Sequence, residues 1–248
     1  MKDYNEKIKH LEKILFNQQY QRDRDIKFYD RIFDLKEGDV IVDGGTWNGM
    51  SILHFLPAIT ETGHVYSYEA SPYLHKTARI KFRKFDNVTI KHKALWSSIG
   101  EIELFVDSRC VNSNSVMRDF IDIQSDRSIT VETTTLDEDL KYIERLDAIK
   151  FNIEGAEIEA LKGAKNILKK HSPQLIVDAH KINGAFCSEG IKDVLQDYGY
   201  NTYFDDYKMA YYATKDEIDE RKTRDLYNER YRYEEKITGR KYEGYVWK

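Results

Sequence analysis

An apolar run that ends in an acid and a cluster of glycines is the first stretch whose residue types suit chemistry. It reads VIVDGGTWNGMSILHF over residues 40–55, with Asp43 closing the apolar run and a helix-like pattern after Gly49. A buried strand, a glycine loop and a helix in this order often bind nucleotide-type ligands, because the glycines bring the backbone close to the ligand. The charge of Asp43 helps to distinguish which ligand the loop would bind.

Two classes of ligand compete for this loop. A dinucleotide fingerprint needs glycine at its first, third and sixth positions, and counting from Gly44 the third position is Thr46. The missing glycine is the one that admits a pyrophosphate, and a carboxylate at Asp43 would repel that dianion. S-adenosylmethionine has no phosphate and carries a cationic sulfonium and a cationic amino group, which an acid attracts. The loop therefore favours S-adenosylmethionine, and the cofactor-binding residues predicted in it are Asp43, Gly44, Gly45, Thr46, Asn48 and Gly49.

A second acid, Glu69, ends the next apolar run in VYSYEASP. A carboxylate there accepts hydrogen bonds from both hydroxyls of a ribose. NAD enzymes place an acid similarly, so Glu69 indicates a nucleoside without distinguishing the two cofactors. The alternative is that Glu69 only supports the helix that follows Ser71 and Pro72. After the third strand, the KALWSS segment is predicted to lie near the adenine, and the further cofactor candidates are Ala70, Ala94 and Leu95.

A bound S-adenosylmethionine would supply a methyl group, and transfer of that group to an acceptor such as a hydroxyl would need an aligned acceptor and a base that removes its proton. Candidates follow two later strands, in FNIEGAE (Asn152, Glu154 and Glu157) and in VDAHK (Asp178 and His180). His180 is the better base by residue type, because its unperturbed pKa lies near 6.5. The alternative for His180 is a purely structural role. The alternative for Glu154, and still more for Glu157, is that the acid only stabilises the first turn of the following helix. Asn152 would orient the acceptor or the methionine amino group.

Strand and helix patterns alternate along the chain and must bring these residues together. Residues 38–45 form a turn, a buried strand and the glycine loop in this pattern, and further strand patterns cover 63–69, 88–95, 146–155 and 173–180. Helical patterns cover 50–59, 74–85, 156–170, with Gly163 as a weak point, and 191–199. Extended pieces at 101–106 and 128–136, a final antiparallel pair at 200–205 and 209–214, and helical stretches at 3–19 and 24–34 complete the pattern. This alternation is typical of an α/β protein with a parallel sheet and crossover helices, whose carboxyl edge binds ligands.

The composition narrows the class of protein. Apolar residues at 41%, charged residues at 33% and a net charge of −4 describe a soluble chain without the basic surplus of a nucleic-acid binder. Two cysteines are too few for a disulfide framework or a zinc pattern. The polar start has no signal-peptide core, and no apolar stretch nears the ~20 residues of a membrane span. We therefore expect a cytoplasmic protein without a nucleic-acid partner.

With these motifs in view, the chain resembles the FkbM family of S-adenosylmethionine-dependent methyltransferases over about residues 38–181. The shared motifs are GDVIVDGGTWNG, VYSYEASP, KALWSSIGEIELF, VETTTLDEDL, LDAIKFNIEGAEIEALKGAKNIL and PQLIVDAH, of which KFNIEGAEIEALKGA is the most specific. The resemblance implies a Rossmann-like class I methyltransferase with a seven-stranded, mostly parallel sheet whose last strand is antiparallel. It also implies methyl transfer, usually to a hydroxyl of a sugar or another small metabolite.

The chain departs from the family pattern at two positions. The family often has Asn where this chain has Trp47, and Asp where it has Asn152. The second change removes a negative charge beside the expected active site, and the acids show no fixed ligand spacing, so no divalent metal is predicted. We expect a helical segment over residues 1–36, the methyltransferase domain over 37–214, and a charged, tyrosine-rich extension over 215–248 that packs on the core, acts as a lid or forms a subunit contact.

Three other functions compete with a small-molecule O-methyltransferase. The first is an NAD-dependent oxidoreductase, but this chain lacks the middle glycine of the dinucleotide fingerprint. A nucleic-acid methyltransferase that acts on exocyclic amines carries adjacent prolines, whereas Pro57, Pro72 and Pro173 are all isolated. A non-catalytic binding module with the same fold stays a possible function because of Asn152. Assembly into a homo-oligomer is a separate possibility.

Overall fold

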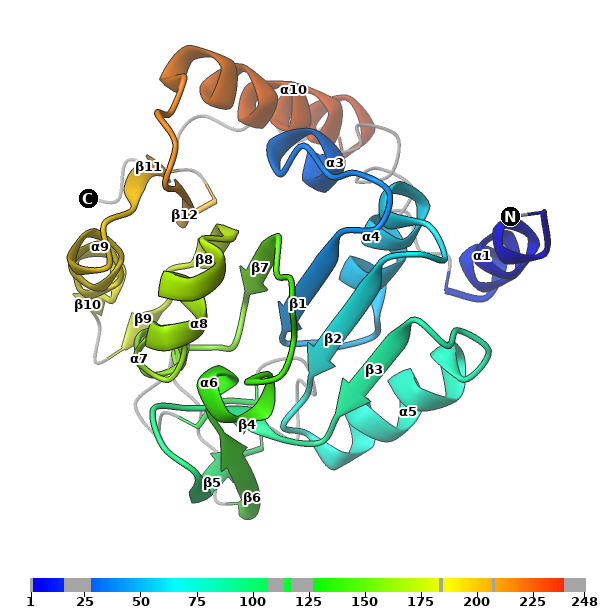
Figure 1. The fold of residues 1–248 in the computed structure, drawn as a ribbon, viewed down its shortest axis with the longest axis horizontal. Helices are drawn as coiled ribbons and strands as arrows, with labels where there is room; N and C mark the ends of the chain where they lie inside the picture. Colours follow the sequence, from blue (N-terminus) through cyan, green and yellow to red (C-terminus); the bar gives the residue numbers. More distant parts are fainter. Residues whose placement is uncertain are drawn as a thin grey trace.

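One large mixed sheet forms the centre of the protein (Figure 1). The computed structural model describes residues 2–15, 28–106, 114–116, 127–182, 185–206 and 208–238. Within these ranges seven strands pair in the order β11–β12–β8–β7–β1–β2–β3. Their bounds are β1 Val40–Gly44, β2 His64–Tyr68, β3 Val88–Lys91, β7 Ala148–Phe151, β8 Gln174–Asp178, β11 Asn201–Asp205 and β12 Ala210–Thr214. The central strands pair in parallel, and the last strand, β12, runs antiparallel to both of its neighbours, which confirms the predicted sheet.

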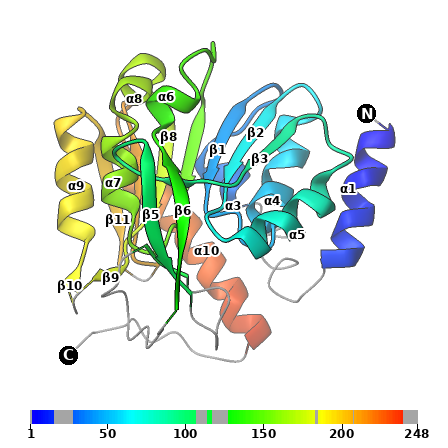
Figure 2. The same ribbon diagram turned by 90° about the horizontal axis from the view of Figure 1, so that it is seen from below.

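Helices cover both faces of this sheet (Figure 2). Successive strand residues point to opposite faces, so Ile41 packs into one apolar cluster and Val42 into the other. The first cluster is covered by α1 (Lys2–Leu15), α3 (Phe28–Ile32), α4 (Met50–Ile59), α5 (Pro72–Phe82) and α10 (Glu220–Thr238). The second is covered by α6 (Leu136–Asp139), α7 (Glu157–Lys162), α8 (Lys165–His171) and α9 (Ser188–Asp197). This is a doubly wound α/β architecture.

A smaller sheet lies beside the carboxyl edge of the large one. It pairs β4 (Ala94–Leu95), β6 (Ser128–Thr134) and β5 (Gly100–Phe105) in the order β4–β6–β5. The sequence predicts one strand over residues 88–95, but the structure divides it. Its first part joins the large sheet as β3, whereas Ala94 and Leu95 pair with Thr133 and Thr134 of β6. A further short pair links β9 (Lys181–Ile182) to β10 (Ala185–Phe186).

The helical stretch predicted over residues 156–170 is broken in the middle, at Gly163. This glycine ends α7, and α8 begins two residues later. A Cβ atom at Gly163 would lie 2.0 Å from the backbone oxygen of Trp96, so the close approach of the two segments requires glycine.

The chain segments outside the central pattern form α1, α3 and α10. Helix α10 packs against α3 and β11, and the two helices lie side by side in Figure 1. The predicted helix ends at residues 16–19 and 24–27, and the last part of the extension, 239–248, lie outside the described residues. The division into three regions stays a prediction. No helix in the described ranges combines the length and apolar character needed to cross a membrane.

Candidate functional site

A cavity of about 470 Å³ opens at the carboxyl ends of β1, β2, β7 and β8. Its volume falls within the ordinary range for small-ligand and cofactor pockets. The predicted site residues that line it are Gly45, Thr46, Glu69, Ala70, Ala94, Leu95, Asn152 and Glu154. The structure therefore brings residues from four separate segments of the chain to one opening, as the parallel-sheet pattern predicts.

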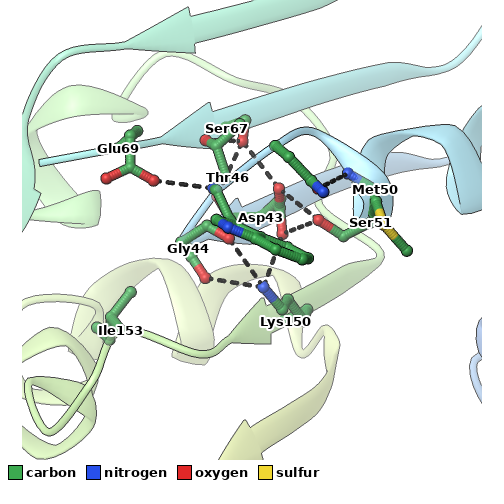
Figure 3. A network of polar contacts seen from close by, with 12 residues as sticks. Asp43, Gly44, Thr46, Met50, Ser51, Ser67, Glu69, Lys150 and Ile153 are labelled. Atoms are coloured by element: carbon green, nitrogen blue, oxygen red, sulfur yellow. Dashed lines mark hydrogen bonds and ion pairs between the residues drawn. The ribbon is translucent and has the colours of Figure 1, made fainter. Parts of the chain in front are cut away.

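Asp43 lies beneath this cavity in a closed polar network (Figure 3). Its side chain has no exposed surface. The Ser51 hydroxyl donates to both carboxylate oxygens at 2.9 Å, and the Ser67 hydroxyl donates to Oδ2 at 2.9 Å. The ammonium of Lys150 lies 3.2 Å from Oδ1. The negative charge of Asp43 is thus compensated by protein groups.

Lys150 is the functional residue that sequence reasoning missed. It sits in the middle of β7 and is only 6% exposed. Burial alone lowers the pKa of its ammonium, but the neighbouring Asp43 outweighs burial and the net shift is upward, so Lys150 stays charged. The signal was present in the strand Ala148–Phe151, where Lys150 is the one charged residue. A lysine in a fully buried strand needs a buried counter-charge.

The same lysine fixes the glycine loop. Lys150 Nζ donates to the backbone oxygens of Gly44 at 3.2 Å and Gly45 at 3.0 Å. Gly45 has a positive φ of 86°, and a Cβ atom there would lie 2.0 Å from the backbone oxygen of Asn152. The loop after β1 therefore touches the end of β7 directly. This close approach explains why the second glycine of the motif is needed.

Glu69 is the acid of the loop region that does reach the cavity. It is 8% exposed, its Oε2 accepts the Trp47 backbone N–H at 2.8 Å, and its Oε1 accepts the Ser71 N–H at 2.9 Å. Burial raises the pKa of this carboxyl, and the two N–H groups oppose that shift. A carboxylate has about four acceptor sites, so two remain for the hydroxyls of a ligand. The helix after Ser71 is capped by the serine side chain itself, through the Leu74 N–H.

The remaining cofactor candidates divide between the lining and its support. Ala94 and Leu95 are almost fully buried and line the cavity together with the apolar Ala70, Leu104 and Val116. Asn48 accepts the Met50 N–H at 3.1 Å at the start of α4. The residues that lie behind the lining are Asp43, Gly44, Asn48 and Gly49. These four residues shape the glycine loop, whereas residues next to them in the sequence line the cavity.

Three ionisable side chains meet where β7 and β8 end. The Nδ1 atom of His180 lies 2.9 Å from Oε1 of Glu157, and its Nε2 lies 3.9 Å from Oε2 of Glu154. Glu157 is fully buried and accepts the backbone N–H groups of Ile153 at 2.9 Å and Gly155 at 3.0 Å. Glu157 therefore holds the loop between β7 and α7 and orients the imidazole.

The pKa values in this cluster decide the protonation states. Burial alone lowers the pKa of His180, but the carboxylates, Glu157 foremost, outweigh it and raise that pKa to about 9. Burial raises the pKa of Glu154 to about 7, with the charge of His180 opposing. At neutral pH His180 is therefore a cation and a donor, and Glu154 is shared between its two forms. Geometry agrees, because Glu154 lines the cavity whereas His180 supports it from behind.

Two further features bear on the chemistry of the site. The Oδ1 atom of Asn152 is buried and has no hydrogen-bond partner among the described residues, although Asn152 lines the cavity. A buried acceptor in that state suits a ligand that brings a donor.

No three His, Cys, Asp or Glu side chains in the described ranges converge as metal ligands.

The cavity also has a wall that sequence reasoning did not assign. Helices α3 and α10 contribute Phe28, Tyr29, Tyr227 and Arg230 to its lining. The sequence predicts that the tyrosine-rich extension packs on the core, acts as a lid or forms a subunit contact. No local pattern indicates that α10 borders the cavity, because its contact with α3 joins segments almost two hundred residues apart.

Comparison with known proteins agrees with this architecture. A profile of the Methyltransferase FkbM domain matches residues 43–202, which is more than half of the chain. Among solved structures, the methyltransferase FkbM from Methylobacillus flagellatus KT is similar with a TM-score of 0.51 and 14% identity. The match covers 85% of this chain and 59% of that one.

Other solved structures resemble the chain less closely in fold. A SAM-dependent methyltransferase from Aquifex aeolicus aligns with a TM-score of 0.48 and 16% identity over 84% of this chain and 98% of that one. An O-methyltransferase from Thermotoga maritima aligns with a TM-score of 0.43 and 15% identity over 79% and 60% of the two chains. No curated protein matches the sequence. The domain match over residues 43–202 and the Rossmann-like sheet together show that the chain belongs to the FkbM methyltransferase family.

Proposed function

We propose that this protein is an S-adenosylmethionine-dependent O-methyltransferase that acts on a hydroxyl of a small acceptor, such as a sugar or a glycan precursor. The observation that carries the proposal is the buried carboxylate of Glu69, which lines a cavity beside the glycine loop of an FkbM domain. The choice of a sugar hydroxyl rests on the family resemblance. The proposal includes a cytoplasmic location, in keeping with the low cysteine count.

The lining residues suit the parts of the cofactor. Glu69 has acceptor sites left for both ribose hydroxyls, and the apolar side chains Ala94 and Leu95 suit the adenine ring. The partnerless Oδ1 of Asn152 suits the cationic amino group of the methionine part. When bound, S-adenosylmethionine supplies an activated methyl group and its own leaving group. The task of the protein is to align the acceptor and take its proton.

Asp43 has an indirect role in this proposal. The sequence argument assigned it to the cationic ligand, but its carboxylate is bonded to Lys150, Ser51 and Ser67. We therefore assign Asp43 to positioning, since it anchors the lysine that holds the backbone of Gly44 and Gly45. Repulsion of a pyrophosphate by Asp43 is correspondingly weak, because Lys150 offsets its charge. The argument against NAD then depends on Thr46 and on the family.

Glu154 is the base that fits the acceptor hydroxyl. It lines the cavity, and a pKa of about 7 matches a general base at neutral pH. His180 was the better candidate by residue type, but a pKa of about 9 leaves it protonated. In the proposal His180 is a positioning cation, held by Glu157, that keeps Glu154 from a still higher pKa. Asn152 and Glu154 then face the two reactants from one loop.

Calorimetry with S-adenosylhomocysteine and with NADH tests the proposal. The wild-type protein should bind S-adenosylhomocysteine and not NADH. Glu69→Gln should weaken that binding by about tenfold or more, because charge-assisted hydrogen bonds contribute about 1.5–3 kcal/mol. The matched control is Glu101→Gln, an exposed glutamate of β5, which should bind like the wild type. Binding of NADH without S-adenosylhomocysteine, or an unchanged affinity in Glu69→Gln, would refute the assigned site.

A further inference from the structure

Helix α10 contributes to the cavity although it lies beyond residues 43–202, the range that matches the family domain. Two of its residues, Tyr227 and Arg230, line the cavity. They stand three positions apart and so share one face of the helix. The side of α10 that points away from these two residues carries exposed charged residues such as Asp225. One face of α10 therefore borders the cavity.

Tyr227 lines the cavity and carries a buried hydroxyl. The side chain is 1% exposed, and its ring packs edge-on against Phe28 of α3 with 5.0 Å between the centroids. Its hydroxyl has no hydrogen-bond partner among the described residues. Burial raises its pKa well above the usual value, so the hydroxyl keeps its proton and can donate. A buried hydroxyl without a partner is costly, and a ligand that accepts its proton would remove that cost.

Arg230 presents a buried cation at the same place. It is 8% exposed, and its guanidinium carbon lies 4.7 Å from the centroid of the Phe28 ring, within cation–π range. Its charge opposes the burial that raises the pKa of Asp178 at the end of β8. Arg230 and Asp178 line the same cavity, which places the guanidinium toward the β8 end, and its planar donors suit a carboxylate.

The position of these two residues relative to Glu69 suggests which group they bind. Glu69 follows β2, and β8 lies three strands away, roughly 14 Å at the usual strand spacing. With a ribose at Glu69 and adenine toward Ala94, the 5′ chain of the nucleoside runs across β1 and β7 toward β8. That chain ends in the α-amino and α-carboxylate groups of methionine. The carboxylate would thus approach the β8 end.

The other cations of the described lining are placed less well for this group. Lys150 is engaged by Asp43 and by two backbone oxygens. Lys93 precedes Ala94, at the opposite, nucleoside end. Lys208 lies in the turn between β11 and β12 and is partly exposed. Arg230 combines burial with a position at the correct end.

We propose that helix α10 completes the cofactor site, with the Arg230 guanidinium and the Tyr227 hydroxyl both binding the α-carboxylate of S-adenosylmethionine. This inference rests on the proposed function and adds two binding residues from outside the family domain. It explains why a partnerless buried hydroxyl and a buried guanidinium share one face of a helix that is otherwise highly charged. Phe28 of α3 contacts both side chains.

Two probes that differ only in the amino-acid part test this inference by calorimetry. S-adenosylhomocysteine carries the α-carboxylate, whereas 5′-methylthioadenosine keeps the nucleoside and lacks it. Arg230→Met, which preserves the apolar stem, should weaken S-adenosylhomocysteine about tenfold to a hundredfold. Its affinity for 5′-methylthioadenosine should stay within about twofold of the wild type. Arg224→Met, an exposed arginine of the same helix, is the control and should change neither affinity.

Tyr227→Phe keeps the test decisive even where the arginine variant folds poorly. The hydroxyl has no partner to lose in the free protein, so this variant should unfold at or above the wild-type temperature. It should still bind S-adenosylhomocysteine several-fold more weakly, as loss of one hydrogen bond requires. Tyr200→Phe is the control, because that buried hydroxyl donates to the backbone of Leu168.

The outcomes separate this inference from the proposed function. A wild-type protein that binds neither probe contradicts the proposed function itself. Normal wild-type binding, with Arg230→Met and Tyr227→Phe both unchanged, overturns only the role of α10. Equal weakening of both probes would also overturn it, because a loss that does not depend on the carboxylate reflects general damage to the cavity.

Discussion

Two acids near the ends of adjacent strands have opposite surroundings. Asp43, at the end of β1, has no exposed surface and is bonded to Lys150, Ser51 and Ser67. Glu154, three residues beyond β7, lines the cavity, and its nearest cation, His180, is 3.9 Å away. An acid whose bonds are already complete maintains the structure. An acid with spare acceptor sites and a pKa near neutrality is available for proton transfer.

The backbone conformation also distinguishes the two acids, because it is regular at Asp43 and strained at Glu154. Asp43 lies in a regular strand paired on both sides. Glu154 has a positive φ of 55°, a conformation that costs a non-glycine residue about 1–3 kcal/mol. Its backbone oxygen accepts the Ser115 hydroxyl at 2.5 Å, which helps to hold it there. Strain tolerated at one acid and absent at the other supports the division into a reacting and a structural carboxylate.

The largest effect is expected when the structural acid loses its lysine. Lys150→Met should lower the free energy of unfolding by about 3–5 kcal/mol, because it leaves Asp43 buried without its counter-charge. Urea unfolding followed by circular dichroism measures this. Lys162→Met is the control, since that lysine pairs with Glu159 at the surface and should change stability by less than about 1 kcal/mol. Similar losses in the two variants would contradict the structural role of the pair.

The second effect is expected at Glu154, the acid proposed as the base, and it concerns the rate of methyl transfer. Glu154→Gln should slow methyl transfer on the order of a hundredfold, as loss of a general base does, and should leave the affinity for S-adenosylhomocysteine unchanged. The measurement is cofactor turnover in a screen of hydroxylated sugar acceptors. In the wild type the rate should rise as pH increases through about 7, because Glu154 must lose its proton to act. A variant that keeps that pH dependence would exclude Glu154 as the base.

The smallest expected effect lies at the histidine behind Glu154. The cation of His180 lowers the pKa of Glu154, so His180→Gln should move that pKa above about 7. Carbon-13 NMR of labelled glutamate carboxyls, followed over pH, measures the shift directly. His75→Gln, on the distant helix α5, is the control and should leave the titration unchanged. A downward shift in His180→Gln would show that the histidine does not act as a cation beside this carboxyl.

The stability of the protein should respond to the same groups. The pKa of His180 is raised from 6.5 to about 9, so its contribution is complete below about pH 6.5 and is lost as the pH rises through about 9. The pKa of Glu154 is raised from 4.5 to about 7, so the folded state is favoured fully below about pH 4.5 and this contribution is lost as the pH rises through about 7. Both groups therefore make the wild type less stable as the pH rises, Glu154 between about pH 4.5 and 7 and His180 between about pH 6.5 and 9.

Local patterns in the sequence predicted the parts of the fold that depend on neighbours along the chain. Alternating apolar runs placed β1, β2, β7 and β8, and strand ends placed Glu69, Asn152 and Glu154 at one edge. The family profile confirmed the resemblance that the motifs indicated. The predicted third strand was wrong in its second half, because Ala94 and Leu95 pair with β6.

Contacts between distant segments could not be read from the sequence. The Lys150–Asp43 pair joins two strands more than a hundred residues apart, and only the lone lysine in an apolar strand pointed to it. The contact of Tyr227 with Phe28 depends on how α10 lies over α3. Protonation was equally hidden, because the ordinary pKa of histidine favoured His180 until its carboxylate neighbours were located. Residue type suggested the chemistry, and only packing assigned each role.

A crystal structure of the protein with S-adenosylhomocysteine is the most direct test of the account. We expect the ribose hydroxyls on the Glu69 carboxylate, the adenine against Ala94 and Leu95, and the Lys150–Asp43 pair intact beneath the loop. A nucleoside bound away from Glu69, or a ligand in contact with Asp43 after displacement of Lys150, would contradict it.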